Sequence, residues 1–423
     1  MDRMQFPWKR AHYTASAASI RPWYPSPRCY NAIPVPMLKS TVLRGLPILL
    51  FITACAPVVG SSTAPQDAET RTPVNGDPIP SPEATSTPAL GAVAILPIPL
   101  HVGYGVRGPW FDIYFTDPAN RASVQSTGGL DGPLAGAIDA ARLSVHIAVF
   151  SLTLGSVREA LIRAHRRGVE VRMVTESDNL DGRDLQRLKD AGIPVLGDRR
   201  QGTMHNKFMV IDGMELWTGS MNFTFSGTYA DNNVLMRVKS PELAADYEAE
   251  FAEMFEDDRF GAESGRATPN PRVMIEGTLV EVLFSPDDGA EDALVDLLDA
   301  ARESVHFMAF SFTSNPLGDA LRRADRAGVA VRGVMDDDQG SSNIGTELPA
   351  FLSAGLDVRL DGNPGQMHEK VLIIDREVVA VGSYNFSRNA SETNDENIVV
   401  IHNDMIAAEF VREFERLYAL AQP

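Results

Sequence analysis

The sequence has few cysteines and few long hydrophobic runs. Only Cys29 and Cys55 occur among its 423 residues, so the chain is not a disulfide-rich scaffold. Its one marked apolar segment, between Met37 and Cys55, is shorter than the ~20 residues that a membrane-spanning helix needs. With 44% hydrophobic and 22% charged residues, the composition is that of an ordinary globular protein, not of a disordered chain or a multi-span membrane protein.

Basic residues are also scarce: 38 Lys and Arg face 56 Asp and Glu, which gives a formal net charge of −18. Seven of the basic residues and one acid lie in the first 54 residues, so the remainder is more acidic still. An acidic surface repels polyanions at long range and disfavours a general nucleic-acid binder. A local basic site stays compatible with this charge, because Arg199, Arg200 and Lys207 lie close together in the sequence.

Residues 37–54 are typical of a secretory signal, with early basic residues, a short apolar core and small residues before Cys55. The ending Ile52-Thr53-Ala54-Cys55 resembles a bacterial lipobox, which implies that Cys55 is lipidated and becomes the mature N-terminus. We therefore expect an exported protein that is lipid-anchored to the bacterial cell envelope. Residues 1–36 lack signal features, and we interpret them as an upstream over-extension of the reading frame. The alternative is a single anchoring segment with a cytoplasmic tail.

Residues 55–105 are rich in Pro, Ser, Thr and Ala, a composition that buries too little apolar surface to fold, and we predict a tether. Beyond it the chain repeats itself: "AARLSVHIAVFSLT" at 140–153 matches "AARESVHFMAFSFT" at 300–313. A period of roughly 160 residues is several times that of a solenoid unit, so each copy is a domain-sized half. We predict the halves at 106–258 and 273–421, joined by a polar linker.

Short apolar runs such as "VHIAVFSL" alternate with helical patterns in both halves. Such runs favour a sheet that is covered on both faces and is largely parallel. The predicted fold class is therefore α/β: a pseudo-dimer of two α/β/α sandwiches, within a monomer that has an internal pseudo-twofold.

Each half carries one copy of a polar motif, His-x-Lys-x4-Asp followed by Gly-Ser-x-Asn, and the copies lie 163 residues apart. Alternate residues of a strand share one face, so the His and Lys of each copy project together, and the apolar residues after them bury the strand. Two imidazoles, two ammonium groups, two hydroxyls and two amides suit a tetrahedral phosphate that develops negative charge. The candidate residues are His205, Lys207, Asp212, Ser220 and Asn222 in the first copy and His368, Lys370, Asp375, Ser383 and Asn385 in the second.

The serines and asparagines of the motifs are the predicted phosphate-binding residues. No group of carboxylates or histidines at metal-ligand spacing accompanies them, so we expect neither a metal nor a cofactor. The two lysines would supply the positive charge that a metal supplies elsewhere.

With both motifs complete, the chain resembles the phospholipase D superfamily over roughly residues 110–420, and we identify it as a lipoprotein member. The resemblance implies phospholipase D-like halves with the active site at their interface. It also implies phosphodiester hydrolysis through a covalent phosphohistidine: one histidine attacks phosphorus, and the other protonates the leaving alcohol and then activates water. In this scheme Asp212 and Asp375 are structural hydrogen-bonding residues, not proton carriers.

The resemblance also predicts how the histidines are oriented, because family members hold each histidine Nδ1–H with a downstream carboxylate. Alignment of the closing strands puts Glu396 at that position for His368 and Asn232 at the position for His205, where Asp231 could substitute. A carboxylate raises the pKa of its histidine and favours the protonated form. We therefore expect His368 to be the general acid and His205 the nucleophile.

Three functions fit these residues. A phosphodiesterase acting on phospholipids is favoured by the predicted lipid anchor, which would place the protein on a membrane, and by the acidic chain. The alternative is an endonuclease of the same superfamily acting on DNA or RNA, which the net charge disfavours. A phosphate-ester binding module without turnover is the third, and the intact motifs argue against it. The sequence does not choose between hydrolysis and transfer to another alcohol, because any hydroxyl can resolve a phosphohistidine.

Two further features repeat between the halves. His146 and His306 lie in apolar strands, where we predict packing or supporting roles. The acidic segments 175–180 and 335–340 follow equivalent strands at the mouth of the site, and we expect solvated loops there instead of calcium ligands.

Overall fold

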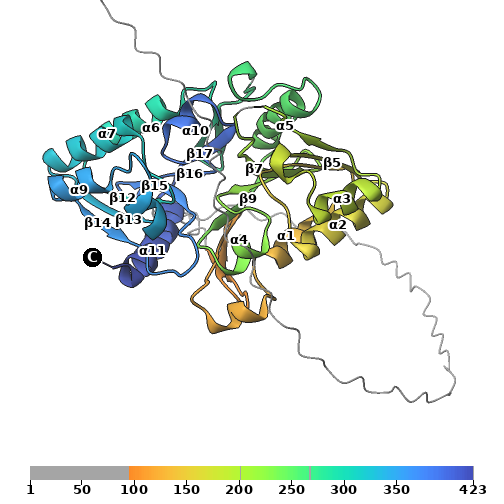
Figure 1. The fold of residues 1–423 in the computed structure, drawn as a ribbon, viewed down its shortest axis with the longest axis horizontal. Helices are drawn as coiled ribbons and strands as arrows, with labels where there is room; N and C mark the ends of the chain where they lie inside the picture. The colour runs from red at the N-terminus through yellow and green to blue at the C-terminus, as the bar shows by residue number, and fades with distance from the viewer. Residues whose placement is uncertain (1–94, 201, 266–267, 423) are drawn as a thin grey trace, which may run out of the picture. The chain divides into compact units, whose positions relative to one another are not determined.

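The structure, a computed structural model, describes residues 95–200, 202–265 and 268–422 (Figure 1). The predictions for residues 1–36, the signal at 37–54, Cys55 and most of the tether lie outside the described residues. The first half contains strands β1 (Leu96–Ile98), β2 (Tyr104–Arg107), β3 (Phe111–Phe115), β4 (Ser144–Val149), β5 (Glu170–Thr175), β6 (Val195–Gly197), β7 (Lys207–Ile211), β8 (Glu215–Gly219) and β9 (Val234–Lys239), and helices α1 (Asp131–Ala140), α2 (Gly155–Arg166), α3 (Arg183–Asp190), α4 (Phe225–Tyr229) and α5 (Pro241–Phe255).

The second half repeats this order with strands β10 (Arg272–Ile275), β11 (Thr278–Ser285), β12 (Ser304–Ala309), β13 (Ala330–Met335), β14 (Asp357–Leu360), β15 (Lys370–Ile374), β16 (Val378–Gly382) and β17 (Glu396–His402), and helices α6 (Ala290–Asp299), α7 (Asn315–Arg326), α8 (Asp337–Ser342), α9 (Leu348–Ala354), α10 (Arg388–Glu392) and α11 (Asp404–Leu420). The strand order is β1-β2-β3-β9-β8-β7-β4-β5-β6 in the first sheet and β10-β11-β17-β16-β15-β12-β13-β14 in the second. Two α/β halves are thus confirmed.

Both sheets are mixed, so the prediction of largely parallel sheets was wrong. Among the strands of the described residues, β4-β5-β6 and β12-β13-β14 pair in parallel, whereas β7 and β15 run antiparallel to both of their neighbours. The motif sequence explains the difference, because only residues 212–214 separate β7 from β8. So short a connection cannot cross over to a parallel strand. The apolar runs reflect strands that are buried on both faces.

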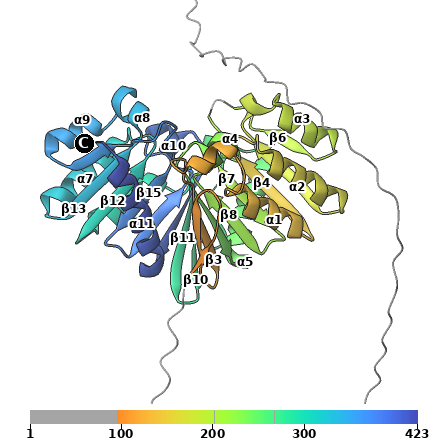
Figure 2. The ribbon, with the colours of Figure 1, turned by 90° about the horizontal axis from the view of Figure 1, so that it is seen from below.

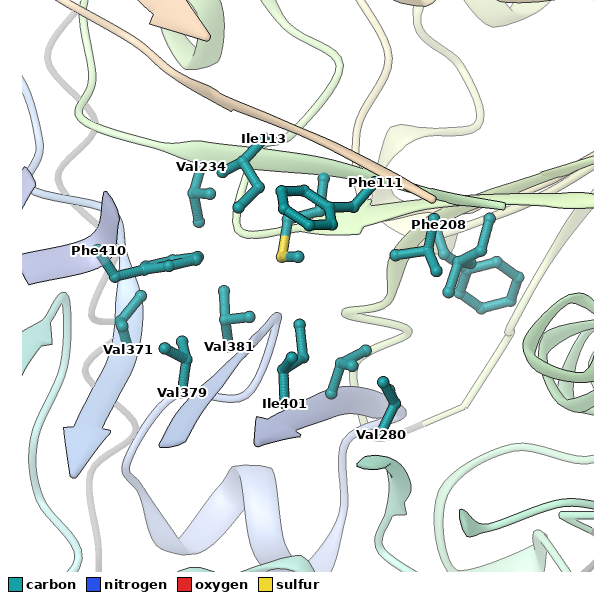
Figure 3. Packing of buried hydrophobic residues seen from close by; sticks show 14 of the residues in the cluster. Phe111, Ile113, Phe208, Val234, Val280, Val371, Val379, Val381, Ile401 and Phe410 are labelled. Carbon is teal, nitrogen blue, oxygen red and sulfur yellow. The ribbon is translucent and has the colours of Figure 1, made fainter. Parts of the chain in front are cut away.

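Helices cover one face of each sheet, and a core shared by both halves covers the other. Helices α1, α2 and α3 pack on the first sheet, and α6, α7 and α9 pack on the second. The shared core contains α5, α11 and strand residues of both halves, including Phe208, Val234, Val371, Ile401 and Phe410 (Figure 3). Each such side chain contributes ~1.5–3 kcal/mol by leaving water, so this core holds the halves together.

Two reciprocal backbone bridges also join the halves, directly before the motif histidines. Met204 bridges to Asp395, and Asn232 bridges to Met367. The N–H of His205 donates to the carbonyl of Asp395 at 3.0 Å, and the N–H of His368 donates to the carbonyl of Asn232 at 2.9 Å. The backbone of each motif histidine is therefore held by the opposite half.

The folded part begins earlier than the predicted boundary at residue 106. β1 and the first residues of β2 lie inside the predicted tether, and the two strands pair antiparallel, with Leu96 opposite Arg107. Because the composition there is rich in proline, the sequence did not predict β1, a short strand at the edge of the sheet. Between the halves, α5 ends at Phe255 and β10 begins at Arg272, which leaves the polar linker between them.

Candidate active site

One residue separates His205 from β7 and one separates His368 from β15, so both histidines lie at the start of these strands. Figure 2 shows α4, α8 and α10 toward one end of the sheets. The fully buried apolar strands that follow, "KFMVI" and "KVLII", fix both motifs in the sheets. The His205 side chain is 13% exposed, and His368 is buried. The two imidazoles and both motif lysines act on one another electrostatically, so the halves bring the four groups into one site.

The Nδ1 partners of the histidines come from the opposite half, which corrects the predicted orienting residues. His205 Nδ1 is 2.8 Å from Glu396 Oε2, so Glu396 serves the first histidine and not His368. His368 Nδ1 is 3.0 Å from Asn233 Oδ1. Asn232 orients neither ring through its side chain, and its backbone carbonyl instead accepts from the His368 N–H.

The motif serines show that the predicted alignment of the closing strands was wrong by one residue, because Glu396 corresponds to Asn233 and not to Asn232. Ser220 Oγ accepts from the N–H of Val234 at 3.1 Å, and Ser383 Oγ accepts from the N–H of Asn397 at 3.0 Å. Val234 and Asn397 are therefore equivalent, and so are the residues before them, Asn233 and Glu396.

The serine hydroxyls hydrogen-bond to the two residues that hold the histidines. Ser220 Oγ donates to Asn233 Oδ1 at 2.9 Å, and Ser383 hydrogen-bonds to Glu396. Both serines are fully buried, so in this structure they hold the orienting residues. Oδ1 of Asn222 and of Asn385 is buried without a hydrogen-bond partner among the described residues. Phosphate contact by the serines and these two amides stays a prediction.

Each motif lysine is almost fully buried and lies over an aromatic ring. Lys207 Nζ donates to the carbonyl of His205 at 2.7 Å, and Lys370 Nζ donates to that of His368 at 2.5 Å. The same ammonium groups lie 5.5 Å from the ring centre of Phe150 and 4.8 Å from that of Phe310. Burial lowers the pKa of Lys207 to about 7 and the pKa of Lys370 well below its ordinary value. A phosphate entering the site would add negative charge beside both amines and favour their protonated forms.

Burial also lowers the pKa of both histidines, to different extents. At His205 the carboxylate of Glu396 opposes the effect of burial, while the lysines add to it. At His368 the positive charges of Lys370, Lys207 and His205 add to burial and hold the pKa well below its usual range.

The motif aspartates lie at the far end of β7 and β15 from the histidines. Asp212 accepts from the N–H groups of residues 142–144, and Asp375 accepts from those of residues 302–304. Both residues have a positive φ, 54° and 53°, where Asp is tolerated better than most residues. These contacts support the predicted structural role of both aspartates, which stays a prediction.

Two pairs of residues beside the histidines were not among the predicted site residues. Phe150 packs on His205 and Phe310 packs on His368, with ring centres 5.4 and 4.8 Å apart. Both follow the repeated apolar strand, which is the signal that could have found them.

The second pair corrects the prediction of solvated acidic loops for one residue in each loop, while acidic residues further along both loops are exposed as predicted. Glu176 Oε2 accepts from the N–H of Met204 at 3.1 Å, and Asp336 Oδ2 accepts from the N–H of Met367 at 3.0 Å. Both carboxylates are buried, and burial raises the pKa of each. They support the backbone directly before the motif histidines.

His146 and His306 are packing histidines, as predicted. His146 stacks on Phe251 with ring centres 4.8 Å apart, and His306 packs on Phe414 at 4.7 Å. Within residues 95–200, 202–265 and 268–422, no group of three or more His, Cys, Asp or Glu is placed to hold a metal. In the same part of the chain, no helix has the length and apolar character needed to span a membrane.

Residues 134–255 and 294–418 match the sequence model of the family described as cardiolipin synthase, PLD-like domain. The chain belongs to the phospholipase D-like family. The mitochondrial cardiolipin hydrolase of Homo sapiens is 36% identical over 136 residues, which are 32% of this phospholipase D-like chain and 54% of the human protein. The chain thus spans about half the length of that relative.

Two further likenesses accompany the family match. A phospholipase D of Rickettsia bellii is 29% identical over 153 residues, 35% of this chain and 76% of that protein. The crystal structure of a phosphatidylserine synthase from Haemophilus influenzae covers 69% of this chain and 84% of its own, with a TM-score of 0.54 and 13% identity. At that identity the likeness shows a common fold alone.

Proposed function

We propose that the protein is a phospholipase D-like phosphodiesterase that hydrolyses phospholipids through a covalent phosphohistidine. The observation that carries the proposal is the meeting of two His–Lys pairs, one from each half, with the Nδ1 of each histidine held by a residue of the opposite half. A ring whose Nδ1 is occupied in this way presents Nε2 to the substrate.

The two rings would share the reaction. One Nε2 attacks phosphorus while the bond from phosphorus to the leaving alcohol breaks, and the other ring gives its proton to the leaving oxygen. That second ring then takes a proton from water, whose oxygen displaces histidine nitrogen from phosphorus. A phosphate monoester leaves, and both rings regain their starting protonation states. Lys207 and Lys370 stabilise the negative charge on the phosphoryl oxygens.

The surface charge supports a lipid over a nucleic acid. Nucleic-acid affinity comes largely from Lys and Arg that neutralise phosphates. Three arginines on segments beside the motifs are instead paired with acids: Arg199 with Asp258 at 2.5 Å, Arg200 with Glu263 at 2.9 Å and Arg388 with Glu392 at 2.8 Å. The names of the human and rickettsial relatives, a cardiolipin hydrolase and a phospholipase D, point the same way.

We further propose that the protein is exported as a monomer and anchored to the bacterial cell envelope through a lipid on Cys55. The signal-like segment 37–54 and the residues before Cys55 support this. A tether from Cys55 to β1 would let the catalytic halves reach substrate in the same membrane.

The test is to incubate the full-length protein with vesicles of phosphatidylcholine, with and without cardiolipin, and separately with single- and double-stranded DNA. We expect phosphatidic acid to be released, together with choline from phosphatidylcholine or phosphatidylglycerol from cardiolipin, with little DNA cleavage. The His205→Ala and His368→Ala variants are the matched controls and should lose the activity. Faster cleavage of DNA than of lipid would favour the endonuclease, and vesicle binding without turnover would favour a binding module.

A further inference from the structure

The two halves supply equivalent catalytic groups except at the Nδ1 partners of the histidines. His205 is held by a fully buried carboxylate, Glu396, and His368 by a fully buried amide, Asn233. The serines that hold these partners, the lysines and the phenylalanines are the same in both halves. The residue between His and Lys also differs, but Glu396 and Asn233 are the side chains that hydrogen-bond to the rings.

We propose that this difference divides the two catalytic roles: His368, held by Asn233, attacks phosphorus, and His205, held by Glu396, begins the cycle as the proton donor. This assignment is the reverse of the one expected from the sequence, because Glu396 contacts the other histidine. It rests on the proposed phosphodiesterase function. Asn233 and Glu396 are positioning residues, since each acts through the ring that it holds.

The charges that face each ring favour this division. His368 is faced by Lys370, Lys207 and His205, by the Phe310 ring and by the neutral amide of Asn233. An amide oxygen accepts the Nδ1–H without compensating a positive ring, so His368 stays neutral with its Nε2 lone pair free. His205 faces the same two lysines and also the carboxylate of Glu396, which stabilises its imidazolium form. When the two rings together carry one extra proton, that proton is therefore bound to His205.

The assignment gives a balanced cycle. His368 Nε2 bonds to phosphorus, the bond from phosphorus to the alcohol oxygen breaks, and His205 Nε2–H protonates that oxygen. Neutral His205 then accepts a proton from water, whose oxygen bonds to phosphorus as the nitrogen–phosphorus bond to His368 breaks. Because Asn233 offers no negative charge to the phosphorylated ring, that intermediate stays reactive toward water.

The deciding experiment uses a diester whose leaving group needs no proton, such as a 4-nitrophenyl phosphodiester, with full-length His205→Ala and His368→Ala. His205→Ala lacks the acid and the base for the second step, so it should release a burst of nitrophenol and accumulate phosphate on the peptide that contains His368. His368→Ala lacks the nucleophile and should release nitrophenol at least ~10³-fold more slowly than the wild type.

A burst from His368→Ala with phosphate on the His205 peptide would overturn the assignment. So would loss of the burst from both variants, since the activated ester removes the need for a proton donor. A wild-type protein that turns over neither this ester nor any lipid or nucleic acid would instead contradict the proposed function itself.

Rate profiles against pH provide a second readout that a purely structural role would not move. Asn233→Asp places a carboxylate on His368, raises the pKa of the nucleophile and should shift the acidic limb toward higher pH. Glu396→Gln lowers the pKa of the proton donor and should shift the alkaline limb toward lower pH. Asn120→Asp, the same change at a residue whose side-chain oxygen accepts from the N–H of Ala122, is the matched control and should leave the acidic limb in place. A profile in which Asn233→Asp moves only the alkaline limb would contradict the division of roles.

Discussion

Asp375 closes the motif of the second half, and its replacement should test whether this residue is structural or catalytic. Its carboxylate accepts from the N–H groups of Glu303 at 2.7 Å, of Ser304 at 3.0 Å and of Arg302 at 3.0 Å. The residue itself has φ 53°. Asp375→Ala removes all three acceptor contacts and places alanine in a left-handed backbone conformation.

The expected loss of stability follows from these contacts. Each hydrogen bond contributes about 0.5–1.5 kcal/mol net, and residues 302 and 303 are exposed, so water replaces part of what is lost. The left-handed conformation costs alanine about 1–2 kcal/mol more than glycine. We expect Asp375→Ala to lower the free energy of unfolding by about 3 kcal/mol, and Asp375→Gly to lose about 1 kcal/mol less.

The assay is urea unfolding of the wild type and both variants, together with phosphodiesterase rates measured well below each unfolding midpoint. Folded Asp375→Gly should keep its catalytic rate constant within a few-fold of the wild type, because the carboxylate lies at the far end of β15 from His368. A variant with wild-type stability and a rate lowered by ~10³-fold would refute the structural role.

The same residue should contribute to the pH dependence of stability in the acid range. Burial raises the pKa of Asp375, but the N–H groups of residues 302–304 outweigh it and lower the pKa overall. A carboxyl group whose pKa is lowered by folding stabilises the protein above its unfolded pKa of ~3.9, and this contribution is lost as pH falls through the folded pKa. Asp375→Asn should therefore unfold with a weaker pH dependence below pH ~4, as measured by urea midpoints. An unchanged acid dependence would contradict this account.

Three further predictions concern the site and the anchor. Activity should persist in excess EDTA, because Lys207 and Lys370 supply the positive charge at phosphate; loss of turnover that Mg²⁺ or Ca²⁺ restores would contradict this. Burial lowers the pKa of Lys207 to about 7, so its ammonium group loses its proton as pH rises through neutrality. The affinity for inorganic vanadate, measured by inhibition, should fall over the same pH range, and Lys207→Met should bind vanadate weakly at every pH. A vanadate affinity of the wild type that does not change with pH would argue against this lysine as the phosphate contact. Cys55→Ser should abolish palmitate labelling and leave an unprocessed precursor, and full labelling of that variant would exclude the lipobox.

Much of the site could be predicted from residues that repeat at a fixed offset. His205, Lys207 and Asp212 recur with the same spacing as His368, Lys370 and Asp375, and the buried apolar strands between each Lys and Asp fix both copies in the sheets. The histidines themselves lie before these strands, so strand alternation does not account for their orientation. The structural role of the aspartates was predictable for a similar reason, because a polar residue directly after a buried strand can fold back onto nearby N–H groups. The relative direction of neighbouring strands was not predictable, since an apolar run indicates that a strand is buried but not whether the next strand is parallel to it.

The sequence by itself determined two α/β halves, the motif residues and the likeness to the phospholipase D superfamily, because all of these depend on composition and short-range spacing. Only the tertiary structure decided which half orients which histidine. Asn233 and Glu396 contact histidines of the opposite half because the backbone bridges at Asn232 and Asp395 hold the start of β9 and of β17 beside the opposite motif. A contact between residues more than a hundred positions apart is set by the packing of the halves on their shared core, and no local pattern records it.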